Sequence, residues 1–310
     1  MEPDGDLLVV GESLVDVVEG ADGARREHAG GSAANVAVAL ARLDRPVRLA
    51  TALADDRNGA IVATYLGRDR VSLAADPETI ERTASARAVL GADGAARYEF
   101  DLEWVLSPVP AEPVPLAVHA CSLGAVVAPG AEEVLATLRR FRGAALTSYD
   151  VNARPAFTGT GPDLAAAVER VAAEADLVKA SDEDLAAVYP DLDEEQAVER
   201  LLGLGPVALV VTRGADGATW YAAGRGRPAS VAAPSVQVAD TIAAGDTFSA
   251  ALLDALWARG LVGPGAAERI AALPRRTRAK LLTHAVRAGA LATTRPGADP
   301  PYRAEVGSAG

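Results

Sequence analysis

Cysteine is almost absent from this chain of 310 residues, in which Cys121 stands alone. A single thiol excludes an internal disulfide framework and is typical of a reducing compartment. The sequence also lacks an apolar run of about 20 residues, which a membrane-spanning helix requires, and a basic segment followed by an apolar secretory core. These absences predict a cytoplasmic protein with no membrane partner, in which Cys121 is a buried structural residue.

Basic charge and histidine are also scarce. Lysine and arginine together number 30 against 42 acidic residues, which gives a formal net charge of −12. This charge would repel nucleic acids and anionic membranes at long range, so neither is an expected partner. The three histidines, His28, His119 and His284, lack the spacing of a transition-metal site. Because the chain as a whole is negatively charged, an anionic ligand must be held by local donors and a metal ion.

Hydrophobic residues make up 50% of the chain, enough to bury a sizeable core in one domain over residues 1–310. Strand-like apolar runs alternate with helical patterns, which predicts an α/β fold with a mostly parallel sheet covered by helices on both faces. The expected strands are 7–11, 46–51, 116–120, 144–149, 176–178 and 207–212. Segments 15–30 and 84–104 break the alternation, and the second indicates a β-hairpin around Gly91-Ala92-Asp93-Gly94.

The segment Asp240-Thr241-Ile242-Ala243-Ala244-Gly245-Asp246-Thr247-Phe248 precedes a long apolar run. Small residues before a helix leave backbone amides free, and the helix dipole adds to their attraction for an anion. A phosphate fits this position. Asp246 in the first turn is then either the group that accepts a proton from an attacking hydroxyl or an ordinary helix cap.

A second glycine-rich turn lies upstream, in Ala29-Gly30-Gly31-Ser32-Ala33-Ala34-Asn35. Its glycines allow the backbone to approach a ligand closely, and Asn35, one turn into the next helix, offers both a donor and an acceptor. Such a turn suits a polyhydroxylated ligand. The same residues also fit an ordinary tight turn into a packed helix.

The two turns resemble the signatures of the ribokinase-like carbohydrate kinases, the phosphofructokinase B family. The resemblance continues through Val9–Asp16, Asp150–Pro155, Lys179–Asp184 and Val210–Ala218. It implies a three-layer fold with a mostly parallel central sheet flanked by helices, and a small β-sheet lid formed by 15–30 and 84–104. It also implies transfer of the ATP γ-phosphoryl group to a sugar hydroxyl with Mg²⁺, allows a monovalent cation such as K⁺, and is consistent with a homodimer through the lid.

The family pattern assigns a role to each matching residue. Asp246 would be the general base, and the amides around Ala243, Ala244 and Gly245 would form the anion hole. The substrate-binding residues would be Asp16, Gly30, Gly31, Asn35, Tyr98 and Arg154. The nucleotide side would include Lys179, Thr212, Gly214, Gly217 and His284. Asp184 would meet Mg²⁺ through water. Tyr98 shares a strand face with Phe100, and that face fits sugar contact, contact with another lid or simple packing.

Four positions depart from the family pattern. Ala243 and Ala54 each replace a glycine, and Ser181 and Asp184 replace Asn and Glu. If position 243 needs a positive φ, the methyl group of Ala243 is costly there; we expect instead a right-handed backbone, which accepts alanine. The 9–16 and 150–155 segments favour a fructokinase, with 2-keto-3-deoxygluconate kinase as the second reading, since Arg154 can bind a carboxylate. A catalytically weakened sugar- or nucleotide-binding regulatory protein is the alternative from another functional class.

Overall fold

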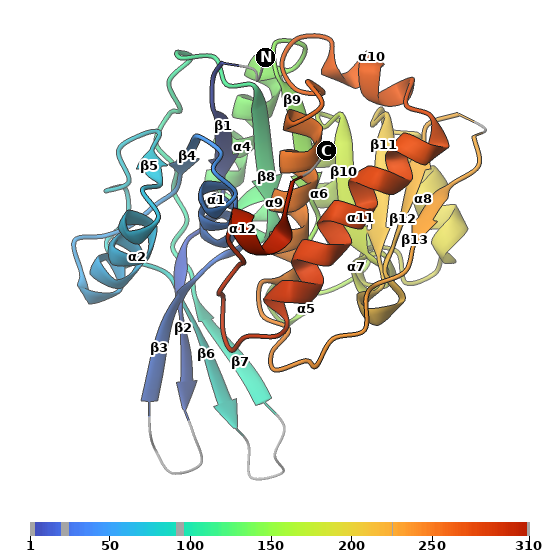
Figure 1. The fold of residues 1–310 in the computed structure, drawn as a ribbon. Coiled ribbons are helices and arrows are strands. Elements are labelled where there is room, and N and C mark those ends of the chain that lie inside the picture. Colours follow the sequence, from blue (N-terminus) through green and yellow to red (C-terminus); the bar gives the residue numbers. More distant parts are fainter. Residues whose placement is uncertain (1–3, 20–24, 91–95, 225, 309–310) are drawn as a thin grey trace.

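The computed structural model describes residues 4–19, 25–90, 96–224 and 226–308 (Figure 1). Its main sheet has nine strands in the order β13-β12-β11-β10-β9-β8-β1-β4-β5. These strands are β1 (Leu7–Val10), β4 (Val47–Ala50), β5 (Ser72–Leu73), β8 (Ala117–Cys121), β9 (Leu146–Asp150), β10 (Leu177–Ser181), β11 (Ala208–Thr212), β12 (Ala218–Ala222) and β13 (Ala229–Val231). The pairs β11-β12 and β12-β13 are antiparallel, and the other six pairs are parallel. The mostly parallel sheet is thus confirmed, and β5, β12 and β13 are additions that the apolar runs did not predict.

Both faces of this sheet are buried, as its nearly continuous apolar strands require. Leu7 and Val9 belong to one core and Leu8 and Val10 to the other, because successive strand residues point to opposite faces. The first core is covered by α1 (Ser32–Arg42), α2 (Arg57–Arg68), α9 (Ala244–Trp257), α10 (Ala266–Ala271), α11 (Arg275–Ala292) and α12 (Arg303–Val306). The second is covered by α3 (Ser122–Val126), α4 (Gly130–Phe141), α6 (Pro162–Ala172), α7 (Asp182–Val188) and α8 (Glu194–Leu202).

Helix α9 is buried along nearly its whole length. Every residue from Asp246 to Trp257 is buried, and the helix packs between α1 and α11 (Figure 1). A helix that is apolar on all sides must be covered on all sides. The N-terminus of α9 is therefore held firmly at the edge of the sheet where the parallel strands end.

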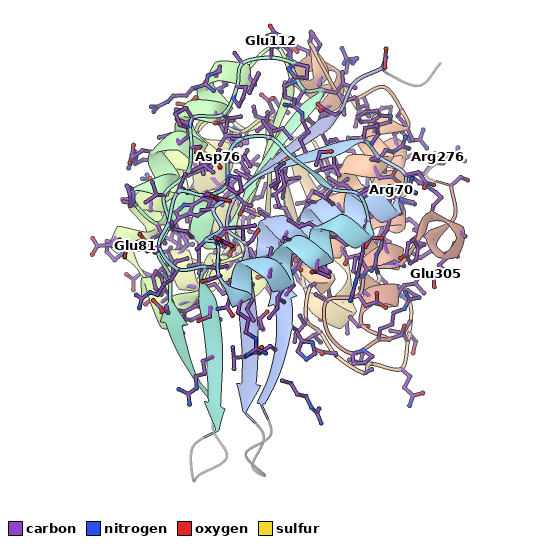
Figure 2. The ribbon with its side chains drawn as sticks, turned by 90° about the vertical axis from the view of Figure 1, so that its left-hand side faces the viewer. Arg70, Asp76, Glu81, Glu112, Arg276 and Glu305 are labelled. Atoms are coloured by element: carbon purple, nitrogen blue, oxygen red, sulfur yellow. The ribbon has the colours of Figure 1, made fainter. Side chains whose placement is uncertain are left out.

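A second, four-stranded sheet has the order β3-β2-β6-β7. Its strands are β2 (Leu14–Glu19), β3 (Arg25–Gly30), β6 (Ser85–Leu90) and β7 (Ala96–Asp101), and β6 pairs antiparallel with β7. Figure 2 shows this sheet extending from the main body, whose surface carries exposed charges such as Glu81, Glu112 and Glu305. Residues 91–95, which include the expected glycine turn, lie outside the described part.

The fold places the one cysteine of the chain and shows the character of its helices. Cys121 is fully buried, and burial raises the pKa of its thiol well above the ordinary value, as expected of a structural cysteine. Among the helices of the described residues, none combines the length and the apolarity needed to cross a membrane.

Candidate active site

Two clefts meet at the carboxyl ends of the parallel strands, where ligands of open α/β sheets bind. The first cleft, of about 590 Å³, is lined by Asp16, Gly31, Asn35, Asn152 and Arg154, among others. The second cleft, of about 630 Å³, is lined by Thr212, Gly214, Gly217, Val286 and Gly289, among others. Thr241 and Gly245 line both clefts. The turn that begins α9 therefore forms the boundary between them.

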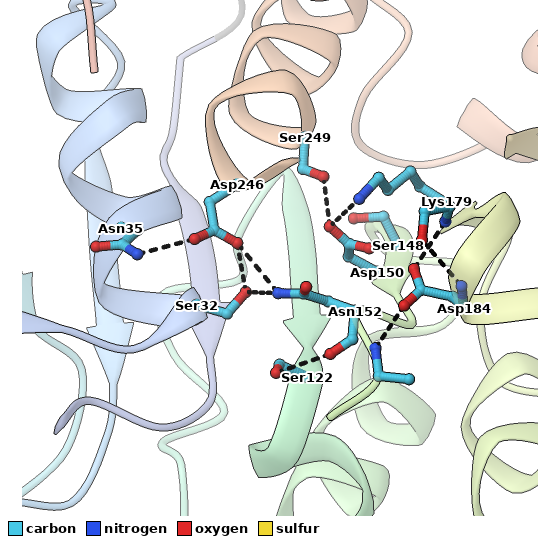
Figure 3. Close-up of polar contacts among 12 residues, drawn as sticks. Ser32, Asn35, Ser122, Ser148, Asp150, Asn152, Lys179, Asp184, Asp246 and Ser249 are labelled. Atoms are coloured by element: carbon cyan, nitrogen blue, oxygen red, sulfur yellow. Dashed lines mark hydrogen bonds and ion pairs between the residues drawn. The ribbon is translucent and has the colours of Figure 1, made fainter. Parts of the chain in front are cut away.

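Asp246 lies at this boundary and is 5% exposed. Ser32 Oγ donates to its Oδ1 at 2.7 Å, and Asn35 Nδ2 donates to its Oδ2 at 2.8 Å (Figure 3). Asn152 Nδ2 donates to Oδ1 at 3.3 Å. These bonds tie Asp246 to other segments of the chain, and α9 has no side-chain cap. The reading of Asp246 as an ordinary helix cap is therefore wrong.

Ala243 is the N-cap residue of α9 and has a left-handed backbone, with φ 58° and ψ 13°. The expectation of a right-handed conformation at this position is wrong. A left-handed residue turns the chain sharply before the helix, and the Ala244 amide donates to the Thr241 carbonyl oxygen at 3.3 Å. Ala243 itself lines the first cleft.

The double glycine before α1 makes room for protein atoms. A side chain at Gly30 would overlap the carboxylate of Asp16. Gly31 has φ 93°, and a Cβ there would lie 2.6 Å from the carbonyl oxygen of Glu12. The turn is therefore packed against the segment that carries Asp16, and Gly31 and Asn35 still line the first cleft. Burial raises the pKa of Asp16 to about 6, although Arg154 and His28 oppose the shift.

Glu12 is a site residue that the sequence analysis did not select. It is 2% exposed, and its Oε2 accepts from the Gly124 amide at 2.7 Å while Oε1 accepts from the Ser32 amide at 3.3 Å. Burial raises the pKa of Glu12 to about 7 against these bonds. Glu12 thus joins the start of α1 to α3. Its position inside the Val9–Asp16 motif was the available signal.

Ser32 and Asn152 were also missed as partners of Asp246. Asn152 Nδ2 donates to Ser32 Oγ at 3.0 Å, so the two residues support the same carboxylate. Ser32 follows the double glycine, and Asn152 lies in the Asp150–Pro155 motif, yet neither pattern indicates that they meet.

Arg154 lies on the exposed side of the first cleft, where its Nη1 donates to Asn152 Oδ1 at 2.8 Å. Tyr98 belongs to β7, but its side chain lies outside the described part. Phe100, two residues on, lines the first cleft and contacts Phe157 of α5 (Pro155–Thr158) edge to face, with ring centroids 5.5 Å apart. This contact joins the second sheet to the main body.

Two residues assigned to the nucleotide side do not lie there. Lys179 is absent from the lining of the second cleft, and its Nζ pairs with Asp150 Oδ2 at 3.0 Å. His284 is buried and its Nε2 contacts Asp254 Oδ2 at 2.8 Å. Asp254 also accepts from Arg45 and Arg303, so His284 belongs to a charged cluster at the far end of α9. Thr212, Gly214 and Gly217 do line the second cleft.

Asp184 is buried at the start of α7 and forms a capping box with Ser181. Its Oδ2 accepts from the Ser181 amide at 2.7 Å and its Oδ1 from the Ala153 amide at 2.8 Å. Each oxygen keeps a second lone pair, so this carboxylate fits a water-mediated contact with a metal ion better than direct ligation. Within the described residues, no three His, Cys, Asp or Glu side chains are grouped as metal ligands.

Comparison with known proteins agrees with this geometry. A fructokinase of Rhizobium leguminosarum bv. trifolii is 32% identical over 262 residues, which cover 81% of this chain and 79% of the relative. A fructokinase of Klebsiella pneumoniae is 30% identical over 303 residues and 95% of each chain. The solved structure of a fructokinase with bound ATP from Xylella fastidiosa superimposes with a TM-score of 0.85 at 29% identity, over 97% of this chain and 96% of that one. Residues 4–305 match the family described as pfkB family carbohydrate kinase, and the chain therefore belongs to that family of sugar kinases.

Proposed function

We propose that this protein transfers the γ-phosphoryl group of ATP to a hydroxyl group of fructose. The observation that carries the proposal is the place of Asp246, a buried carboxylate at the boundary of two clefts and in the first turn of α9. Fructose would occupy the first cleft and ATP the second. The relatives named fructokinase support this choice of sugar.

In this reaction the sugar hydroxyl oxygen forms a bond to the γ-phosphorus, and the bond from that phosphorus to the β-γ bridging oxygen breaks. ADP leaves, and Asp246 accepts the hydroxyl proton. The amide of Gly245 would donate to the transferring oxygens, where oriented donors act most strongly, and the amide of Ala244 would join it on releasing the Thr241 carbonyl. Asp16 and Asn35 would hold sugar hydroxyls, and Thr212, Gly214 and Gly217 would border the nucleotide.

Mg²⁺ supplies positive charge to the nucleotide phosphates when bound, and Asp184 would meet its hydration shell. A monovalent cation such as K⁺ is a further expectation, which activity in potassium and sodium salts tests. The second sheet would act as a lid that excludes water from the first cleft and as the surface of a homodimer. An enzyme that consumes ATP and has one buried thiol fits the cytoplasm.

One observation favours 2-keto-3-deoxygluconate as a second candidate acceptor. The Arg154 guanidinium is exposed on the first cleft, and arginine binds a carboxylate through two parallel hydrogen bonds. The substitution Arg154→Met would then weaken binding of the keto-acid far more than binding of fructose, because fructose carries no charge.

The test is ADP release measured with a panel that includes fructose, 2-keto-3-deoxygluconate and ribose. The proposal expects the highest kcat/KM with fructose. A higher kcat/KM with the keto-acid would replace fructose by that substrate. Absence of turnover with every sugar, combined with a nucleotide-induced thermal shift, would contradict the proposed reaction.

A further inference from the structure

Lys179 lies in a buried polar cluster beneath the start of α9. Its side chain is almost fully buried, and Asp150 Oδ2 accepts from both Lys179 Nζ at 3.0 Å and Ser249 Oγ at 2.8 Å (Figure 3). Lys179 comes from β10, Asp150 from the neighbouring β9, and Ser249 from α9, one turn after Asp246. The cluster therefore links two strands of the sheet to the helix that carries the base.

The ammonium group lies directly behind the turn that separates the two clefts. A Cβ built on Gly245 would lie 3.2 Å from Lys179 Nζ, a distance at which the lysine would have to move. Gly245 lines both clefts, whereas Lys179 lines neither. The positive charge is thus placed behind the backbone that a phosphoryl group must pass.

Lys179 Nζ and Asp150 Oδ2 form a close ion pair at 3.0 Å. Burial lowers the pKa of Lys179, but Asp150, Asp184 and Asp246 outweigh burial and raise that pKa above its ordinary value. Burial raises the pKa of Asp150 to about 6, and the Lys179 ammonium opposes that rise. Within the described residues, Asp150 Oδ1 has no hydrogen-bond partner. A buried pair with an unsatisfied oxygen contributes little net stability compared with apolar residues, so stability alone does not account for it.

We propose that Lys179 is a positioning residue for phosphoryl transfer: held by Asp150, it supports the first turn of α9 and places a fixed positive charge behind Gly245, at the boundary of the clefts. This inference rests on the proposed function, because it concerns the phosphoryl group that crosses that boundary. A fixed charge in a site shielded from water stabilises developing negative charge without reorganisation. The role differs from a direct nucleotide contact, since Lys179 does not line the second cleft.

The experiment compares Lys179→Met, Asp150→Asn and the double variant, with kcat, both KM values and Tm measured for each. Lys179→Met leaves a buried carboxylate unpaired, so both Tm and kcat should fall. The double variant removes both charges and should regain most of the lost Tm. Its kcat should stay at least about 30-fold below that of the native enzyme, somewhat less than the loss of a direct oxyanion donor, with both KM values little changed.

A double variant with native Tm and a kcat within about threefold of the native enzyme would overturn the proposal, since a threefold change corresponds to well under 1 kcal/mol of barrier. It would show that Lys179 serves only to neutralise Asp150. A large rise in the KM for ATP alone would overturn it in favour of nucleotide contact.

The pH profile of Asp150→Asn provides a second measurement that does not depend on the double variant folding. This variant keeps the ammonium group but removes the nearest charge that raises its pKa, so the alkaline fall of kcat should begin at a lower pH. An unchanged alkaline limb would contradict the proposal. Native enzyme that phosphorylates no sugar of the panel would refute the proposed function itself, whereas active native enzyme with insensitive variants would refute only the role of Lys179.

Discussion

Replacing Ala243 by glycine should stabilise the protein, because Ala243 has a left-handed backbone with φ 58°. An L-residue in this conformation costs about 1–2 kcal/mol, a penalty that glycine does not carry. Glycine also gains freedom in the unfolded chain, which costs about 0.4–1 kcal/mol. The difference predicts that Ala243→Gly raises the free energy of unfolding by about 0.5–1 kcal/mol. For a domain of this size, the matching rise in Tm is about 1–3 °C.

The neighbouring Ala244 provides a matched control. It is the first residue of α9 and does not have a positive φ. Glycine in a right-handed helical position costs about 0.5–1 kcal/mol relative to alanine. Ala244→Gly should therefore lower Tm while Ala243→Gly raises it.

The assay is thermal and urea unfolding of both variants beside the native protein, at one pH and without ligand. The two substitutions remove the same methyl group from adjacent residues, so the sign of their difference reports the backbone conformation. If both variants lose similar stability, Ala243 is not strained and the left-handed turn does not store the predicted energy.

Three further outcomes are expected. Asp246→Asn should lower kcat by about 10³-fold, within the range for loss of a general base, while direct titration finds the sugar Kd little changed; near-native turnover would remove Asp246 from this role. The pKa of Glu12 is raised by burial from 4.5 to about 7, so its contribution to stability is present below pH 4.5 and is lost as the pH rises to about 7. Unfolding of Glu12→Gln across this window should therefore show the variant gaining stability relative to the native protein, and a constant difference would refute the assignment. Phe157→Ala removes the edge-to-face contact with Phe100 and should raise the KM for sugar about two- to tenfold, the equivalent of about 0.5–1.5 kcal/mol, with kcat nearly unchanged; an unchanged KM would show that this contact does not hold the second sheet.

The parallel strands could be predicted from sequence because each is a short apolar run that its own residues define. β1 is Leu7-Leu8-Val9-Val10 and is buried on both faces, as such a run requires. The strands β12 and β13 at one end of the sheet carry no comparable signal: β13 has three residues and, within the described part of the chain, pairs with β12 alone. Their placement depends on strand pairing, which a local pattern does not contain.

The wrong assignments of Lys179 and His284 have the same physical origin. Each is a polar residue in or near a motif. The sequence does not show which face of β10 or α11 is buried against other parts of the chain. Lys179 is opposite Asp150 in the register of β10 on β9, and His284 faces Asp254 from α11 to α9. Both partners lie about 30 residues away in the chain, so only the tertiary structure reveals that the side chains are paired and buried.

The support of Asp246 depends on strained residues that no pattern indicates. Besides Ala243, Ser122 and Asn152 have positive φ, 52° and 37° respectively. Such conformations persist only where the surroundings over-determine them. Here the surroundings are the site itself: Ser122 Oγ donates to the Asn152 carbonyl, and Asn152 Nδ2 donates to both Ser32 and Asp246. The backbone strain at these three residues is therefore offset by contacts around the Asp246 carboxylate. These contacts hold the proposed base in place before a substrate binds.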